Sequence, residues 1–279
     1  MKKTICAIMM AAIALMACGN KKAEQTNSEE TKEKVLVLYY SQTGATKAVA
    51  EEIQKQLEAD IEAIELEQPY DGDFGATIAR CQQEKADSIL PTMKALKKNI
   101  ADYDVVFLGY PVWFGTYASP IASLLKEQNF EGKKVVTFCT FGSGGLQTST
   151  KDVKEALPKA DVAEGYGVRN ARISAVADEL NRFLIEAGYK KGEVEALPAF
   201  MEHKPVTEAE TDIFNQACGD YQMPLGTPVD FAVRETSTST DYEFGVSSTD
   251  QAGIPQASTI YVTISKEEGA KPEFTQVVR

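Results

Sequence analysis

The chain has 279 residues, of which 43% are hydrophobic, and 41 acidic residues against 29 basic ones give it a net charge of −12. Its length predicts more than one domain, and its acidity disfavours binding to nucleic acid or to anionic lipid. A single histidine and five cysteines without a C-x-x-C pair exclude a multi-histidine metal centre, a zinc ribbon and a thioredoxin-type dithiol. We therefore expect no metal site.

The first residues are typical of a secretory signal peptide. Residues 1–17 have two lysines directly after Met1 and continue as an apolar run that is too short to span a membrane. The run ends in LMACG, which resembles the lipoprotein box of bacteria. That resemblance implies that Cys18 becomes the first mature residue and carries lipid. The alternative is an ordinary cleaved signal in which Cys18 has no role.

A polar segment follows, and its composition predicts a disordered tether over residues 18–33. We expect a soluble folded part that contacts the membrane only through the lipid anchor, in the bacterial cell envelope. Gly19 in place of aspartate favours the periplasmic side of the outer membrane, by resemblance to the enteric sorting rule.

From residue 34 to residue 190 the chain alternates strand and helix patterns. Apolar or β-branched runs predict five strands, at residues 34–40, 61–66, 104–109, 134–139 and 161–168. Amphipathic segments between them, and a last one at residues 173–187, predict helices. The pattern predicts an α/β fold with a five-stranded, doubly wound parallel sheet, in which ligands bind at the C-terminal ends of the strands.

Three loops follow predicted strands at that edge, and we number them in chain order. The first loop, residues 41–46 (SQTGAT), combines three hydroxyl residues and a glycine, which suits a phosphate held by backbone N–H groups. It lacks the lysine and the spacing of a nucleoside triphosphate P-loop. The alternative is that Ser41 or Thr43 only caps the following helix.

The second loop, residues 110–116 (YPVWFGT), has two adjacent aromatic residues, Trp113 and Phe114. They could stack on a flat conjugated ligand or could cap the core. The third loop, residues 140–145 (TFGSGG), has three glycines in four positions, which permit close approach to a ligand edge. A flexible turn is the alternative there. We expect the three loops to converge.

The three motifs, in this order, resemble those of the flavodoxins, and the resemblance covers about residues 34–190. Among the flavodoxins, the chain is most similar to the longer bacterial flavodoxin-like proteins. The resemblance implies tightly held, non-covalent FMN. The phosphate would be held by Ser41, Gln42, Thr43, Gly44, Ala45 and Thr46. The isoalloxazine ring would be lined by Pro111, Val112, Trp113, Phe114 and Gly115. The pyrimidine side of the ring would contact Phe141, Gly142, Ser143 and Gly144. The polar insertion at residues 67–100 is either a substrate wall or surface padding.

Residues 191–206 read as a linker, and residues 207–279 as a small α+β domain with one helix and four antiparallel strands. This domain distantly resembles the cystatin-like fold. Residues 235–241 lack the Q-x-V-x-G pattern of protease inhibitors, so we expect a docking or structural role. His203 lies in the linker, where we expect it to face solvent.

The leading functional hypothesis is an FMN-binding electron-transfer protein, anchored by lipid, whose partners are redox proteins or small electron acceptors. No residue is singled out as catalytic, because the flavin would supply the chemistry. One alternative is an FMN-dependent reductase of quinones or nitro compounds. Another is a non-catalytic binding module that holds no flavin.

Overall fold

A computed structural model describes residues 33–70, 72–219, 221–250 and 252–279. The predicted signal peptide, Cys18 and nearly all of the predicted tether lie outside these residues.

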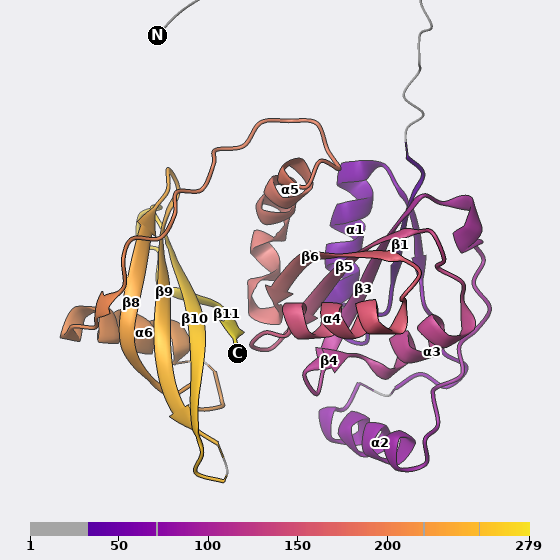
Figure 1. Ribbon diagram of the computed structural model, residues 1–279, viewed down its shortest axis with the longest axis horizontal. Helices are drawn as coiled ribbons and strands as arrows, with labels where there is room; N and C mark the ends of the chain where they lie inside the picture. The colour runs from indigo at the N-terminus through magenta and orange to yellow at the C-terminus, as the bar shows by residue number, and fades with distance from the viewer. Residues whose placement is uncertain (1–32, 71, 220, 251) are drawn as a thin grey trace, which may run out of the picture. The chain divides into compact units, whose positions relative to one another are not determined.

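Five parallel strands form the first sheet, as predicted (Figure 1). In spatial order they are β2 (Asp60–Ala63), β1 (Val35–Tyr39), β3 (Val105–Trp113), β5 (Lys134–Phe141) and β6 (Asp161–Arg169). The strand at the centre, β3, pairs with β1 and with β5 in parallel register. Its residues 105–110 are fully buried, which is what a continuous apolar run predicts for a strand covered on both faces.

Helices cover both faces of this sheet. One face packs against α1 (Ala45–Leu57) and α5 (Val176–Glu186), which follows the 3-10 helix η2 (Asn170–Ala175). The other face packs against α3 (Ser119–Glu127) and α4 (Leu146–Ala156). The chain is therefore doubly wound, and the ends of β1, β3 and β5 meet at one edge.

In the first sheet, the C-terminal ends of two strands differ from the sequence prediction by three residues or more. Strand β3 continues through Trp113 and pairs antiparallel with the short strand β4 (Thr116–Tyr117), so the second loop is a hairpin. Its two turn residues, Phe114 and Gly115, both have positive φ, as a tight primed turn requires. Strand β2 ends at Ala63, three residues before the predicted end. The buried Leu66 makes only an isolated bridge to Met93.

The insertion between β2 and β3 contains α2 (Phe74–Ala86) and the 3-10 helix η1 (Ile100–Asp102). Asp73 begins α2 by accepting a hydrogen bond from the backbone N–H of Ala76. Tyr70 and Cys81 are buried in the same core as α3 and α4. The insertion is therefore more than surface padding.

The second sheet is antiparallel, in the order β11 (Glu273–Val278), β10 (Pro255–Ser265), β9 (Ser239–Thr249), β8 (Thr227–Glu235) and β7 (Lys204–Pro205). Helix α6 (Glu208–Cys218) packs its Phe214 and Ala217 against this sheet. The two residues of β7 fall inside the predicted linker. They are too few to show a periodic pattern, and they form a strand only because β8 offers a free edge.

In the described ranges, no helix combines the length and the apolar character that crossing a bilayer demands.

Candidate functional site

The three loops lie at the C-terminal edge of the first sheet, as their places after β1, β3 and β5 require. A direct contact links two of them. The hydroxyl groups of Thr46 and Thr140 are 2.8 Å apart, and both side chains are about 1% exposed. Because a buried hydroxyl needs a partner, this pair holds the start of α1 against the end of β5.

The first loop presents unused backbone donors. Gly44, with φ of 98°, precedes α1, and no side chain caps that helix. The hydroxyl of Ser41 instead accepts a hydrogen bond from the N–H of Gly44, at 3.2 Å. The backbone N–H groups of Gln42, Thr43 and Ala45 make no hydrogen bond to any described residue. A helix N-terminus with open donors is an anion-binding arrangement, so side-chain capping does not account for this loop.

The aromatic residues of the second loop have different environments. Trp113 is half-buried and packs edge to face against Tyr40 and Tyr70, with ring centroids 5.8 Å and 5.0 Å away. Burial raises the pKa of Tyr40 to about 12, so its hydroxyl keeps its proton even in alkaline solution. Phe114 is 68% exposed and has a φ of 52°, a left-handed conformation that costs a phenylalanine about 1 kcal/mol. Trp113 thus packs on the core, whereas Phe114 leaves an aromatic face open.

The insertion contributes to this side of the site; its sequence alone leaves open whether it forms a substrate wall or surface padding. The side-chain amide of Gln42 donates to the hydroxyl of Thr77 on α2, at 2.7 Å. Tyr70 donates to Glu84 at 2.5 Å, and the Arg80 guanidinium lies 4.0 Å from the centre of the Tyr70 ring. The spacing of Thr77 and Cys81, one helical turn apart on one face, was the available signal.

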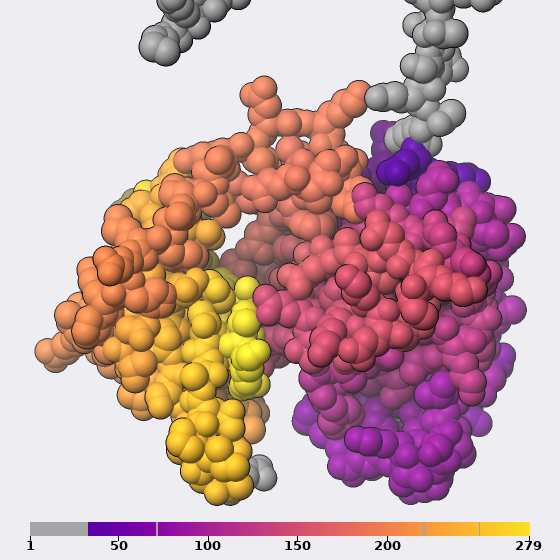
Figure 2. Space-filling model, viewed as in Figure 1, coloured from indigo at the N-terminus to yellow at the C-terminus, as the bar shows by residue number. Residues whose placement is uncertain are grey.

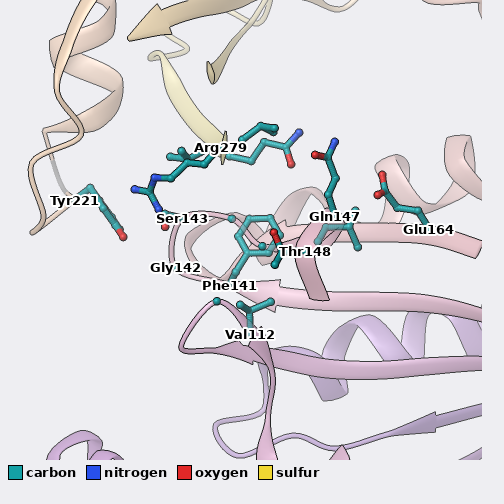
Figure 3. A pocket seen from close by; sticks show the side chains of 16 residues that line it. Val112, Phe141, Gly142, Ser143, Gln147, Thr148, Glu164, Tyr221 and Arg279 are labelled. Carbon is teal, nitrogen blue, oxygen red and sulfur yellow. The ribbon is translucent and has the colours of Figure 1, made fainter. Parts of the chain in front are cut away.

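A cavity of about 420 Å³ lies beside the third loop (Figure 3). This volume falls within the range of about 300–1,000 Å³ that small-molecule sites occupy. Its lining includes residues from the second and third loops but none from the first. The lining residues are Val112, Gly115, Phe141 to Thr148, Glu164, Tyr221 and Gln276 to Arg279. Burial raises the pKa of the Glu164 carboxyl, which is the acidic group of the lining.

The residues predicted from the sequence therefore gather at one edge in two groups. One is the open first loop with its neighbouring aromatic cluster, and the other is the cavity between the second and third loops. Tyr221 and residues 276–279 join the cavity from more than 70 positions further along the chain. No local pattern in the sequence marks them as part of a site.

The parallel strands lie in the order β2-β1-β3-β5-β6, which is 2-1-3-4-5 when only the parallel strands are counted. This order, with an open anion-binding loop after the first strand, defines a flavodoxin-like α/β protein. The sequence agrees with this class, because the profile of the family described as Flavodoxin matches residues 34–184. The chain belongs to that family.

Individual relatives cover only parts of the chain. A curated NAD(P)H dehydrogenase (quinone) from Cupriavidus metallidurans is 31% identical over 94 residues. That match covers 34% of this chain and about half (46%) of the relative.

Among solved structures, a flavoprotein from Bacteroides eggerthii is 30% identical, with a TM-score of 0.45, over 53% of this chain and 98% of its own. A flavoprotein from Lactobacillus acidophilus, solved in complex with FMN, is 24% identical, with a TM-score of 0.45, over 54% of this chain and 98% of its own.

Proposed function

We propose that this chain binds FMN at the C-terminal edge of the first sheet and carries electrons between partners. The observation that supports this most directly is the first loop. Its N–H groups at Gln42, Thr43 and Ala45 are free of protein acceptors among the described residues, at the N-terminus of α1. A phosphate monoester would satisfy these donors and would gain from the helix dipole.

The remaining residues fit a flavin. The ring would lie by the second loop, where Phe114 is open and Trp113 is held by Tyr40 and Tyr70. Its pyrimidine side would lie by the third loop, at the cavity of about 420 Å³. Stacking on an aromatic ring contributes on the order of 1 kcal/mol beyond the area buried. The loops thus match the three chemical parts of FMN, which are an anion, a flat conjugated ring and a polar ring edge.

Bound FMN would accept and donate the electrons, which none of the side chains in this site does. The protein's part is to hold and tune it. Trp113 and Phe114 limit the access of water to the ring, and the first loop anchors the phosphate. The net charge of −12 disfavours added negative charge on the cofactor, so it makes the reduced form a stronger donor.

A reductase of quinones or nitro compounds is the second candidate. One observation favours it, which is the likeness to an NAD(P)H dehydrogenase (quinone) over 94 residues. A carrier and a reductase differ in how many electrons move in each step and in whether the protein oxidises NAD(P)H directly. A third candidate, a binding module without flavin, requires that purified protein fail to bind FMN.

The experiment is a visible absorption spectrum of the protein purified without residues 1–18, before and after addition of FMN, followed by stepwise reduction. Yellow protein that is reduced in two separate one-electron steps supports the carrier. Reduction in a single two-electron step, with direct oxidation of NADH, supports the reductase. Protein that stays colourless after FMN is added contradicts both.

We further propose that lipid on Cys18 anchors the protein at the cell envelope, on the periplasmic side of the outer membrane. Its contact with the membrane would then be the lipid alone, and its partners would be redox proteins or small electron acceptors. Labelling of the full chain with a radioactive fatty acid in a bacterial host tests the anchor. The Cys18→Ala variant should take up no label, whereas equal labelling of both chains contradicts the proposal.

A further inference from the structure

The last strand of the second sheet is bonded to the third loop. The backbone N–H of Val277 in β11 donates to the carbonyl of Ser143, at 2.7 Å. Arg169 at the end of β6 joins the same two segments. Its Nε donates to the carbonyl of Gly142 at 2.8 Å, and a terminal nitrogen donates to the carbonyl of Phe274 at 3.0 Å. Arg169 is only 6% exposed, so this contact belongs to the interior of the protein.

An ion pair supports the same contact. Arg172, in η2, is paired with Glu273 at the start of β11, with 3.1 Å between Nε and the carboxylate, and with Glu179 of α5 at 2.7 Å. The Arg172 side chain is only 11% exposed, whereas that of Glu273 is 59% exposed, so solvent still screens the pair that reaches β11 in part. Both ends of β11 are therefore held against the first domain.

The backbone of β11 comes close to the backbone of the third loop at Gly144. A Cβ atom at this position would lie 2.2 Å from the carbonyl oxygen of Val277, which is a clash. At Gly142 the nearest atom to such a Cβ would be on the Tyr221 ring, 4.0 Å away. Neither glycine has a positive φ. The need for glycine at position 144 therefore comes from β11 and not from the conformation of the loop itself.

The same strand and the residue after it close the cavity. Gln276, Val277 and Val278 of β11 line it together with Arg279. Figure 3 shows Arg279 across the cavity from Val112. The space-filling view shows the yellow end of the chain against the surface of the first domain (Figure 2).

We propose that β11 is a built-in wall of the flavin pocket, which covers the ring on the side of the third loop and slows the release of FMN. This inference rests on the proposed function. It assigns the second domain a role in cofactor retention, and it adds Gln276, Val277 and Arg279 to the binding site.

The hydrogen bonds indicate that β11 borders the proposed flavin site and does not compete with the flavin for the same groups of the third loop. Strand β11 and Arg169 use the carbonyl groups of Gly142 and Ser143. The backbone N–H groups of Ser143 and Gly144 make no hydrogen bond to any described residue. The polar edge of a flavin ring carries two carbonyl oxygens, which need donors, and one N–H group between them, which needs an acceptor. The strand therefore occupies two acceptors of the loop and leaves its donors for the carbonyl oxygens of the ring.

The test compares Gly144→Ala with Gly72→Ala in the full chain. Gly72 lies in the insertion, outside the proposed site; its φ is not positive, and an added Cβ would meet no atom within 4 Å. Each variant adds one methyl group, but only Gly144→Ala should displace β11. We expect Gly144→Ala to raise the dissociation constant and the release rate of FMN by about tenfold or more, and Gly72→Ala to change them by less than about threefold. Equal effects of the two substitutions overturn the proposal. Tighter binding by Gly144→Ala overturns it too, because β11 would then compete with the cofactor.

A second measurement needs no flavin. Hydrogen exchange at the Val277 amide should be slow in wild-type apoprotein and in Gly72→Ala, and faster in Gly144→Ala. If wild-type protein does not bind FMN at all, the proposed function and this inference both fail. If it binds FMN but the two variants behave alike, only the inference fails. Should Gly144→Ala not fold, Val277→Pro removes the N–H donor from an edge strand and serves the same comparison.

Discussion

The first and third loops are built alike and held differently. Each follows a buried strand of the same sheet, and each leads into a helix through a glycine of positive φ, Gly44 or Gly145. The backbone of the first loop is ordered by its own neighbourhood, through the hydrogen bond from Gly44 to Ser41. The third loop is held by residues that come more than 100 positions later, in β11. A local motif can thus be independent at one site and rely on a distant part of the chain at the next.

The largest expected effect tests whether the third loop relies on that distant support. Arg169→Met should lower the free energy of unfolding by about 2–3 kcal/mol, because two buried carbonyl groups lose a charged donor. Urea denaturation followed by circular dichroism measures it. Arg182→Met on α5, where the side chain is partly exposed, is the control and should change stability by less than about 0.5 kcal/mol. A similar small loss of stability in both variants would contradict the conclusion that the third loop relies on contacts made by Arg169.

The next effect tests the independence of the first loop. Gly44→Ala places an alanine at a φ of 98°, a strain of about 1–2 kcal/mol that would move the free N–H groups of the loop. We expect FMN to bind about tenfold more weakly, as measured by quenching of flavin fluorescence.

Gly188→Ala is the matched control for that substitution. Gly188 also has a positive φ and no atom within 4 Å of an added Cβ, but it follows α5 at the opposite edge of the sheet. It should lose similar stability and keep its affinity for FMN. Weakened binding in both variants would indicate a general loss of structure.

A smaller effect should have opposite signs for stability and for binding. Phe114→Gly relieves a left-handed φ of 52°, and should raise the free energy of unfolding by up to about 1 kcal/mol. It also removes the exposed ring, so FMN should bind about fivefold more weakly. Thermal denaturation of the apoprotein and a flavin titration give the two values. A loss of stability would show that Phe114 packs in the fold and is not kept for the ligand.

The smallest effect concerns the second sheet. His203 lies between two carboxylates, with Nδ1 2.6 Å from Asp230 and Nε2 3.0 Å from Glu243. Hydrogen bonds to Asp230 and then to Glu243 raise its pKa above the ordinary value near 6.5. The stability from this contact is therefore full below about pH 6.5, and it is lost as the pH rises through the higher pKa of the folded state.

Because the His203 side chain is 41% exposed, we expect less than about 1 kcal/mol from this contact. Urea midpoints of wild type and His203→Gln should differ at pH 5.5 and converge at high pH. An unchanged difference across that range would contradict the titration of His203. His203 is partly exposed, in line with the solvent-facing position expected from the sequence, but it also links β8 to β9 through Asp230 and Glu243.

The parallel sheet could be predicted because β1, β3 and β5 are continuous apolar runs. Such a run is typical of a strand that is buried on both faces, as in a parallel sheet covered by helices. The extension of β3 to Trp113 could not, because it depends on pairing with β4 across a turn at Phe114 and Gly115. The cystatin-like likeness of the second domain stays a prediction, as do the roles assigned to the individual loop residues. The antiparallel strands of that domain were expected from their pattern, except for β7.

The sequence by itself determined the doubly wound fold, the family and the placing of three chemically distinct loops at one edge. These follow from local patterns, since strand order along the chain dictates where each loop emerges. The tertiary structure alone decided that Tyr70 and Thr77 support the site and that Gly144 must be a glycine. It also decided that β11 lines the cavity. Those features depend on contacts between residues far apart in the chain, and a buried carbonyl or a close backbone approach leaves no periodic signal in the amino-acid order.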